Sequence, residues 1–559
     1  MIYLIRRLLW TAALWASAAL FSCVDKDYDL TDVDTDEIAV GDQLVLPLGS
    51  GVISADDLLD VKKNDEVKVD GDGNYVLSYS GQIEIDPPAE LGFSDSRFQA
   101  VELGIPGSLP PDAGDFESDG RIVFDAGECD LTFETSDIGR LDSVWFDTER
   151  GRSRLYFDLS CRDIRLDRGE AALHFTAVFP KGYRLVPEDA GSGSFSGNEY
   201  SCTVPFAELR TGKRIGLRLE TAVVGTDDRI AYGAELLVKK GSSISVAGTP
   251  AVQIGGGLAS PDYQVIFGQV ESRFSGQSVD ISTQGLSDLF EGDDNVLSFA
   301  DPRIRLEAVS GIGIPMQASF RFESVNDRSG QTQTESVEHI SIDAPRNVGE
   351  TAETNLWLGS VQAGVKPPYE FVRCEINDLI RISPDRIFID TEVAPDADAA
   401  GLRFFSKGAS ARVGYTAEIP LAPAADFRAR TDQRVDDVFD KDLIDYLFSG
   451  GTVEISGTVE NSLPVNFSMN LIIADANDQS VGIRFEPRTV LGSPDGTAVS
   501  SSVTYTITRQ DMPKMETARN LRIALDAYAD DKLAGRSLRP DQQAKLILKV
   551  RKTGGILIK

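Results

Sequence analysis

Short runs of alternating apolar and polar residues cover most of the chain beyond residue 45. The runs are separated by Gly, Asp, Asn and Pro, and a period of two residues is typical of half-buried β-strands. The clearest runs are Glu66–Val69, Tyr75–Tyr79, Ala172–Phe179, Gln264–Phe267, Ser319–Phe322, Arg386–Asp390 and Val453–Val459. The pattern predicts an all-β fold, with antiparallel β-sandwich domains in tandem rather than strands alternating with helices.

Helical signals are few and short. Ser54, followed by acidic residues, predicts a capped helix over 54–59. The stretch 435–448 places apolar residues at helix-like spacing. The sequence Asp70-Gly71-Asp72-Gly73-Asn74 lies between two predicted strands. It predicts a hairpin turn, because glycine accepts the positive φ that such turns need.

A weak internal repeat links two distant parts of the chain. Each copy has a strand, a proline break, a second strand and a polar turn, and the prolines are Pro315 and Pro464, 149 residues apart. The polar turns are Asn326-Asp327-Arg328 and Asp475-Ala476-Asn477-Asp478. Since proline ends ladder pairing, it is expected to form a corner that redirects the chain to another strand. The offset is about the size of one domain.

The first residues of the chain predict export. Arg6 and Arg7 precede an uncharged run of fourteen residues, 8–21, and Ser22 and Cys23 follow. This is the pattern of a signal peptide, because a membrane-spanning helix needs about 20 predominantly apolar residues. The arrangement resembles a bacterial lipoprotein signal, although Phe21 stands where a smaller residue is usual. The resemblance implies that Cys23 becomes the lipidated N-terminus. The alternative is an ordinary secretory signal with an incidental cysteine.

An acidic segment follows Cys23 and predicts an extended, solvated tether. Its beginning resembles the surface-export signal of Bacteroidota lipoproteins, and the residues that carry the resemblance are Asp25, Lys26, Asp27 and Asp29. The resemblance implies a lipid anchor in the outer membrane and exposure at the cell surface. Without it, the protein would face the periplasm.

Two further stretches carry a family resemblance. The strand that ends in Asn461-Ser462-Leu463-Pro464 resembles the strand-Asn-x-x-Pro-strand phrase of late-embryogenesis-type sandwiches. Together with Asp27-Tyr28-Asp29-Leu30 and Leu46-Pro47-Leu48-Gly49-Ser50, it resembles surface lipoproteins of Bacteroidales. That group is known for its architecture and not for an established activity, so the resemblance implies a fold and a location only.

Composition suggests consecutive domains in a chain of 559 residues. The predicted segments are 1–22 (signal peptide), 23–45 (tether), 46–245 (first β-sandwich region, which the Pro-rich stretch near 106–111 could divide in two), 246–395 (second domain) and 396–559 (third domain). The final strand, 544–550, is expected at a sheet edge, with its lysines preventing unwanted pairing, and a docking role is the alternative.

Charge and cysteine content restrict the partners. The formal net charge is −33, which argues against nucleic acid, because phosphate binding requires clustered Lys and Arg. The cysteines other than Cys23 are Cys129, Cys161, Cys202 and Cys374, and their spacing is not that of a metal site. We expect buried thiols in strands, with one disulfide as the alternative, and no cofactor beyond the N-terminal lipid.

The sequence contains little that indicates catalysis. Its two histidines, His174 and His339, lie in strand-like runs far apart, and no hydrolase, zinc-protease or P-loop motif occurs. Asp32, Asp34 and Asp36 resemble the start of a calcium loop, but Glu37 stands where an EF-hand needs glycine, so a solvated tether explains them better. The chain is therefore expected not to be an enzyme.

Three classes of function remain. The first is a lipid-anchored envelope protein whose sandwiches form a binding or scaffolding module for a glycan or protein. The second is a fimbria-related anchor or subunit that exchanges strands between protomers. The third, a glycan-active hydrolase using two carboxylates, is disfavoured by the small number of tryptophans.

Overall fold

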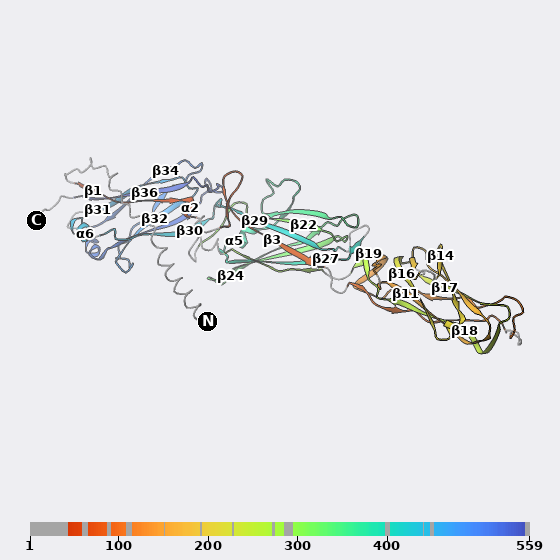
Figure 1. Ribbon diagram of the computed structural model, residues 1–559. Coiled ribbons are helices and arrows are strands. Elements are labelled where there is room, and N and C mark those ends of the chain that lie inside the picture. Colours follow the sequence, from red (N-terminus) through yellow and green to blue (C-terminus); the bar gives the residue numbers. More distant parts are fainter. Residues whose placement is uncertain are drawn as a thin grey trace, which may run out of the picture. The chain divides into compact units, whose positions relative to one another are not determined.

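The computed structural model describes residues 43–58, 65–86, 91–107, 114–149, 151–189, 193–225, 228–270, 274–283, 295–396, 403–439, 441–447 and 452–553. It confirms the all-β fold class, with the strands arranged in three sandwiches (Figure 1). We call them the outer, middle and innermost sandwiches. The names refer to the sequence, in which the strands of one sandwich lie between two strands of the next.

The outer sandwich contains one early strand and the last strands of the chain. Its first sheet has the order β1 (Gln43–Ser54), β36 (Gln543–Thr553), β31 (Thr452–Asn461), β34 (Val499–Ile507). Its second sheet has the order β30 (Arg428–Val435), β35 (Asn520–Tyr528), β32 (Asn466–Ala474), β33 (Arg488–Val490). The hydroxyl of Tyr505 in β34 donates a hydrogen bond to the carbonyl of Met469 in β32 at 2.6 Å, which joins the two sheets through the core.

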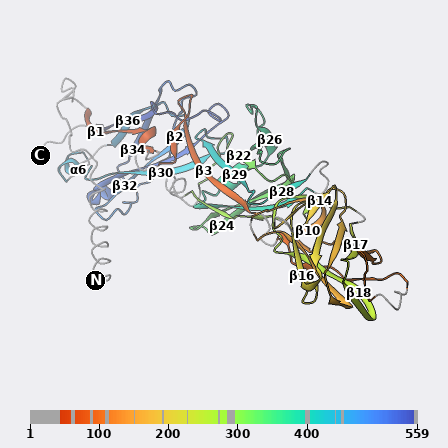
Figure 2. The same ribbon diagram turned by 45° about the vertical axis from the view of Figure 1, so that its right-hand side comes forward.

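The middle sandwich has a larger first sheet. Its order is β2 (Val67–Val69), β3 (Tyr75–Asp86), β29 (Ala411–Pro420), β22 (Arg303–Ser310), β25 (Ala352–Gly359), β26 (Glu370–Arg373), and β20 (Ser275–Gly276) also pairs with β3. The second sheet has the order β21 (Val279–Ser282), β27 (Arg386–Pro395), β23 (Met316–Asn326), β24 (Gln331–Ile342). Figure 2 shows β3 beside β29, although more than 300 residues separate them in the chain.

The innermost sandwich packs a nine-stranded sheet against a six-stranded one. The nine strands are β28 (Phe404–Ser406), β19 (Tyr263–Val270), β10 (Ile138–Phe146), β16 (Lys213–Val223), β11 (Arg154–Arg168), β18 (Ser243–Ala259) and β5 (Ser96–Arg97), with β13 (Arg184–Pro187) on β16 and β6 (Val101–Gly104) on β18. The six are β14 (Ser194–Ser196), β15 (Glu199–Pro205), β12 (Ala171–Val178), β17 (Arg229–Val238), β7 (Gly120–Val123) and β8 (Gly127–Asp130).

Small elements complete the fold. Beside these sheets lies a two-stranded pair, β4 (Gly92–Phe93) with β9 (Thr135–Ser136). The helices are α2 (Ala55–Leu58), α3 (Phe206–Leu209), α5 (Ile376–Ile380), α6 (Lys441–Leu447) and the 3₁₀ turn η3 (Met512–Thr517). The short helices α2 and α6 lie within the two helical stretches predicted from sequence.

One strand order is common to all three sandwiches. If eight strands of each are numbered along the chain, one sheet has the order 1-8-3-6 and the other the order 2-7-4-5. The eight strands are β1, β30, β31, β32, β33, β34, β35, β36 (outer); β3, β21, β22, β23, β24, β25, β27, β29 (middle); and β6, β7, β11, β12, β15, β16, β17, β18 (innermost). The chain therefore contains three copies of one architecture.

The copies are nested rather than consecutive. Between the first and second strands of the outer sandwich, β1 and β30, lies the whole middle sandwich. Between the corresponding strands of the middle sandwich, β3 and β21, lie the strands of the innermost one except β28, which follows β27 in the chain. Asp86 at the end of β3 is the register partner of Ser275 in β20, so the inserted segment leaves and returns at neighbouring residues. A loop closed in this way accepts a long insertion at small entropic cost.

The consecutive regions expected from composition, 46–245, 246–395 and 396–559, differ from this arrangement. The contacts divide the chain into two discontinuous units: Met1–Ile53, Asp432–Asp526 and Gln543–Lys559 form one, and Ser54–Thr431 and Ala527–Gln542 form the other. Composition can indicate boundaries only between consecutive segments of the chain. These units are instead held together by pairs of strands that lie far apart in the sequence.

The proline corners of the repeat are confirmed. At Pro315 the chain passes from β22 in one sheet of the middle sandwich to β23 in the other, and at Pro464 it passes from β31 to β32 in the outer sandwich. The innermost sandwich makes the same crossing between β11 and β12 through Gly169, whose φ is +83°. That copy has glycine in place of proline, which explains why the sequence pattern revealed only two copies.

The prediction for the last strand was wrong. β36 lies between β1 and β31, so it is not at a sheet edge. Lys545 is the register partner of Glu460, and Arg551 pairs with Glu454. The edge position belongs instead to β1, which sequence reasoning assigned to the start of a different domain.

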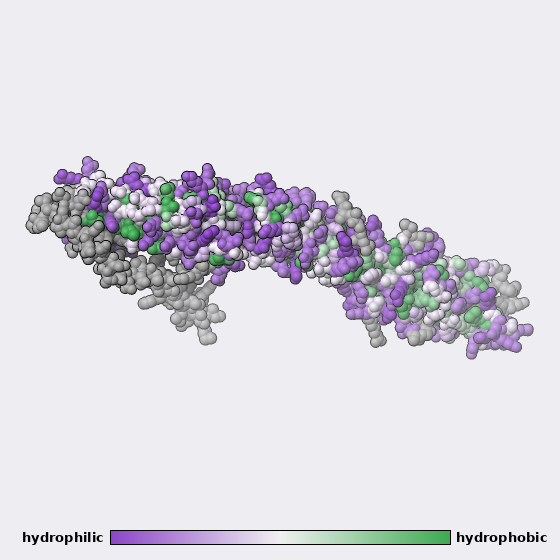
Figure 3. Space-filling model, turned by 90° about the horizontal axis from the view of Figure 1, so that it is seen from above, coloured by the Kyte–Doolittle hydropathy of each residue, from purple (hydrophilic) through white to green (hydrophobic). Residues whose placement is uncertain are grey.

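The cores follow the predicted alternation. In β34, for example, buried residues alternate with exposed ones from Ser501 to Ile507. In the innermost sandwich Phe157 of β11 is completely buried and its ring contacts Phe175 of β12 and Tyr232 of β17. Figure 3 shows a largely hydrophilic surface with scattered apolar spots, which is normal for a folded protein.

Candidate functional site

The residues singled out at the N-terminus lie outside the described residues. These are Cys23, the export residues Asp25, Lys26, Asp27 and Asp29, and the calcium candidates Asp32, Asp34 and Asp36. Lipidation, export and calcium binding therefore remain predictions. Among the residues that the structure describes, no helix is long and apolar enough to cross a membrane.

The two histidines do not come together. His174 lies in β12 of the innermost sandwich, where its Nδ1 is 3.4 Å from the hydroxyl of Thr203, and His339 lies in β24 of the middle sandwich. Within the described ranges, no group of three His, Cys, Asp or Glu side chains could hold a metal ion.

The Asp70–Asn74 segment forms the predicted hairpin turn between β2 and β3. One carboxylate oxygen of Asp70 accepts hydrogen bonds from the backbone N–H groups of Asp72 and Asn74 at 2.9 and 2.8 Å, and Gly73 has a φ of +82°. Burial alone would raise the pKa of Asp70, but the hydrogen bonds from Asn74 and Asp72 outweigh it and lower the pKa. This carboxylate therefore organises the turn.

Four cysteines are free thiols in the structure: Cys129, Cys161, Cys202 and Cys374. Burial raises the pKa of each, to about 12 for Cys161 and Cys374. The sulfur of Cys129 also lies 2.8 Å from the hydroxyl of Tyr232 in the core. A thiol needs to ionise to act as a nucleophile or metal ligand, so the raised pKa values disfavour both roles. Cys129, Cys202 and Cys374 are buried, whereas Cys161 is half-buried, and Cys374 follows β26 rather than lying in a strand.

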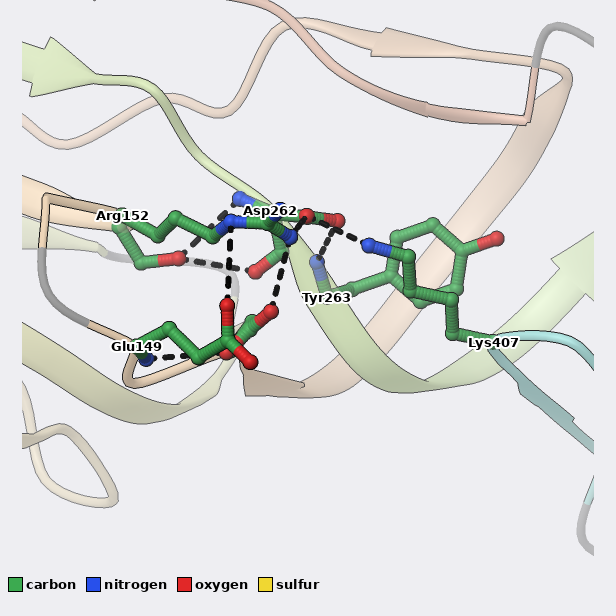
Figure 4. A network of polar contacts seen from close by, with 7 residues as sticks. Glu149, Arg152, Asp262, Tyr263 and Lys407 are labelled. Atoms are coloured by element: carbon green, nitrogen blue, oxygen red, sulfur yellow. Dashed lines mark hydrogen bonds and ion pairs between the residues drawn. The ribbon is translucent and has the colours of Figure 1, made fainter.

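A polar cluster surrounds Asp262, the residue before β19 (Figure 4). Arg152 and Lys407 approach its carboxylate from opposite sides; the Lys407 Nζ is 2.6 Å from one oxygen, and Arg152 forms an ion pair with the same oxygen. Arg152 also pairs with Asp147, and the hydroxyl of Ser153 donates to the backbone carbonyl of Asp262 at 2.8 Å. Lys407 follows β28, which pairs with β19. The cluster therefore links β28 to the rest of the innermost sandwich.

Replacement of Asp262 by alanine should destabilise this junction. Arg152 and Lys407 would lose a shared carboxylate that is only 25% exposed, and the backbone N–H of Tyr263 would lose its acceptor. We expect the free energy of unfolding to fall by about 1–3 kcal/mol in urea denaturation. Arg140→Gln, which breaks an exposed ion pair with Asp142, serves as the control and should change it by less than about 0.5 kcal/mol. Equal effects of the two substitutions would contradict a structural role for the cluster.

The strongest candidate for a binding site is the solvent side of the nine-stranded sheet, across β5, β11, β13 and β16. We call it the arginine face and define it by Arg97, Arg154, Arg184, Arg214 and Arg218 around Tyr156. Residues that alternate with these on β11 and β16 are buried, which directs the arginines and Tyr156 to the solvent side.

Tyr156 occupies the centre of the arginine face. Its register partners are Gly216 on one neighbouring strand and Gly257 on the other. A Cβ at Gly257 would lie 2.9 Å from the Tyr156 hydroxyl oxygen, and one at Gly216 would overlap the carboxylate of Glu188. Because both positions are glycine, the Tyr156 ring and the Glu188 side chain can pack flat against the backbone of the sheet.

Ion pairs cover this surface. The Arg214 guanidinium lies 4.2 Å from the centre of the Tyr156 ring and makes two 2.8 Å hydrogen bonds to Asp158. These bonds lower the pKa of Asp158 against the effect of burial, and the charges of Arg214 and Arg97 add to the lowering. The remaining pairs are Arg154–Glu188 at 2.5 Å, Arg184–Glu220 at 2.9 Å and Arg218–Glu220 at 3.4 Å.

An exposed tryptophan lies on the same sheet. Trp145 in β10 is 43% exposed, while its neighbours Val144 and Phe146 are buried. Its register partner on β16 is Thr221, and Val223, two residues further along β16, is 51% exposed. β10 and β11 pair with successive parts of the same edge of β16, where the register partners of Trp145 and Tyr156 are Thr221 and Gly216. These partners are five residues apart, so Trp145 and Tyr156 are separated by about 17 Å along the strand direction.

Sequence reasoning did not identify the arginine face. Part of its signal was visible, since Arg154-x-Tyr156-x-Asp158 and Arg214-x-Gly216-x-Arg218 place these residues on one side of a strand. What the sequence could not show is that these two strands are neighbours, and that the glycines at 255–257 lie in the strand on the other side.

The fold and this surface define a class first: an all-β protein of nested sandwiches, with an arginine-rich face on the innermost one. The chain belongs to the family described as protein of unknown function (DUF4621), which it matches over residues 28–106 and 269–558. The matched residues include the strands of the outer and middle sandwiches, whereas β7 to β18 of the innermost sandwich fall in the unmatched stretch 107–268. The likeness to lipoproteins and late-embryogenesis-type sandwiches remains a prediction.

Solved structures give more distant similarities. A crystal structure described as "a putative secreted protein" from Parabacteroides distasonis is 20% identical, with a TM-score of 0.46 over 92% of this chain and 100% of that one. A protein in the atomic structure of Sulfolobus turreted icosahedral virus is 10% identical, with a TM-score of 0.11 over 72% of this chain and 84% of that one. Curated proteins give no match.

Proposed function

We propose that the protein is a lipid-anchored component of the cell envelope, exposed at the outer surface, and that its innermost sandwich is a non-catalytic binding module. The observation that carries the binding role is the arginine face, where exposed guanidinium groups and aromatic rings share one side of a sheet. This face belongs to the sandwich that lies largely outside the family match. We infer that the outer and middle sandwiches are the part common to the family and that the innermost one carries the binding function.

The N-terminal sequence supports the location. The signal-like run before Cys23 and the acidic residues after it would place the folded region outside the cytoplasm, on a tether that starts at a lipid anchor. The net charge of −33 favours solubility and repels anionic lipid, which suits a domain held away from the membrane surface.

The location is tested by protease treatment of intact cells. Wild type is compared with Cys23→Ala and with a variant in which Asp25, Asp27 and Asp29 are replaced by asparagine. We expect digestion of wild type, protection of the asparagine variant, and loss of membrane attachment in Cys23→Ala. Wild-type protein that is membrane-bound but protected would place it in the periplasm and end the surface assignment.

A second candidate function, strand exchange between protomers, draws support from β1. This strand forms the edge of its sheet, and Val45 and Val52 in it are 44% and 52% exposed. An edge strand can be replaced by a strand from another chain. Size-exclusion chromatography of the purified protein distinguishes the two functions: a binding module stays monomeric, whereas a structural subunit forms a ladder of oligomers.

A further inference from the structure

We propose that the arginine face binds an anionic polysaccharide whose repeating carboxylate or sulfate groups pair with its guanidinium groups. This inference rests on the proposed binding function and assigns it a ligand class and a site. Planar guanidinium groups suit such ligands, because they make paired hydrogen bonds to carboxylate oxygens.

The charge on the face is the first argument. Its five arginines are accompanied by three carboxylates, those of Asp158, Glu188 and Glu220. Glu220 is shared by two arginines, and Asp158 receives the charge of Arg97 as well as that of Arg214. The face thus has an excess of positive charge in a chain whose net charge is −33. A local excess of positive charge on a negatively charged protein favours an anionic partner.

The existing ion pairs would not block such a ligand. The side chains of Arg214 and Asp158 are 64% and 45% exposed, and those of Arg184 and Glu220 are 76% and 22% exposed. The Arg214–Asp158 pair is exposed on both sides, and exposed ion pairs contribute little to stability, so a ligand anion can replace the Asp158 carboxylate at small cost. The Nε of Arg218 is buried and has no hydrogen-bond partner, so this guanidinium group is only partly satisfied in the unbound protein.

The shape of the face favours a polysaccharide over a peptide. β11 lies between β16 and β18, and its backbone pairs with both, so an extended peptide cannot add to it as a further strand. Trp145 supplies an exposed ring on the same sheet, and such a ring can pack on the apolar side of a sugar. The face extends along β16 from Arg214 to Thr221, the register partner of Trp145, a distance of about 24 Å that is enough for several sugar units.

The experiment measures binding of the mature chain with Cys23→Ser to polygalacturonate by isothermal titration calorimetry. Methyl-esterified polygalacturonate is the matched probe, because it has the same backbone with its charges removed. We expect binding of the acid form that weakens as salt increases, and little binding of the ester. Arg214→Gln should weaken binding about tenfold or more, the loss of one charge-assisted contact.

Arg121→Gln is the control. Arg121 lies in β7 on the six-stranded sheet of the same sandwich, is 66% exposed and is also close to a glutamate, Glu235, at 3.5 Å. It should leave affinity unchanged, and circular dichroism should show that both variants are folded. Trp145→Ala gives an independent reading, with an expected loss of about three- to tenfold from one ring contact.

Each contrary result has a defined meaning. Equal binding of acid and ester would overturn anion recognition while leaving a binding module in place. Binding that Arg121→Gln weakens and Arg214→Gln does not would move the site to the other sheet. Binding of poly-glutamate as tight as that of polygalacturonate would make an acidic protein the partner. No binding of polygalacturonate or chondroitin sulfate would overturn the inference, and the cell-surface test of location would still stand.

Discussion

Replacing Asn461 with alanine is expected to lower the free energy of unfolding of the outer sandwich by about 3–5 kcal/mol. Asn461 is completely buried at the end of β31. Its side-chain amide donates to the carbonyls of Val465 and Leu491 at 2.9 and 3.2 Å, and its oxygen accepts from the N–H of Leu463 at 3.0 Å. Alanine would leave these backbone groups without partners, and each such loss costs about 1–3 kcal/mol.

Urea denaturation followed by circular dichroism, together with calorimetry, measures this effect. Asn477→Ala is the matched control, because Asn477 is exposed in the polar turn of the same sandwich, and it should change stability by less than about 0.5 kcal/mol. If Asn461→Ala lowers the free energy of unfolding by less than about 1 kcal/mol, other groups or water make hydrogen bonds to the backbone groups of the corner. The asparagine would then not organise the corner.

Phe157→Ala is expected to destabilise the innermost sandwich by about 3–5 kcal/mol, the usual cost of removing a buried aromatic ring. The ring of Phe157 lies between the two sheets, with ring centres 5.4 Å from Phe175, 6.2 Å from Phe179 and 5.8 Å from Tyr232. Phe175 and Tyr232 belong to paired strands and Phe179 directly follows β12, so these neighbours cannot easily collapse into the cavity and little of the loss should be recovered.

The destabilising effect of each core substitution should be confined to one melting transition. Asn461 and Phe157 belong to different units of the chain, so calorimetry should show each substitution lowering a different melting transition. Val178→Ala removes an exposed side chain from the same sandwich as Phe157 and should change stability by less than about 0.5 kcal/mol. A single transition lowered equally by both core variants would mean that the sandwiches unfold as one cooperative unit.

Several elements were predictable because their signals are local. The alternation in Val453–Val459 gave β31, Asp70–Asn74 gave the β2–β3 turn, and Pro464 marked the change of sheet. In each case the controlling physics acts within a few residues: a period of two, a turn that glycine permits, or a residue that cannot donate to a ladder.

The order of the domains and the arginine face were not predictable in this way. Composition suggested consecutive regions, yet β1 pairs with β36 and β3 with β29, contacts that no local pattern encodes. Likewise, Arg154, Arg184 and Arg214 lie on three strands and meet only because β11 and β13 both pair with β16.

The sequence by itself determined the fold class, the positions of many strands and turns, the proline corners of two copies, and the acidic character that disfavours nucleic acid. It also supplies the export and lipidation predictions at Cys23. Only the tertiary structure decided that three sandwiches of one strand order are nested, and that arginines from separate strands form one face. The reason is physical: alternation and turn chemistry are properties of neighbouring residues, whereas strand partners are selected by burial across the whole chain.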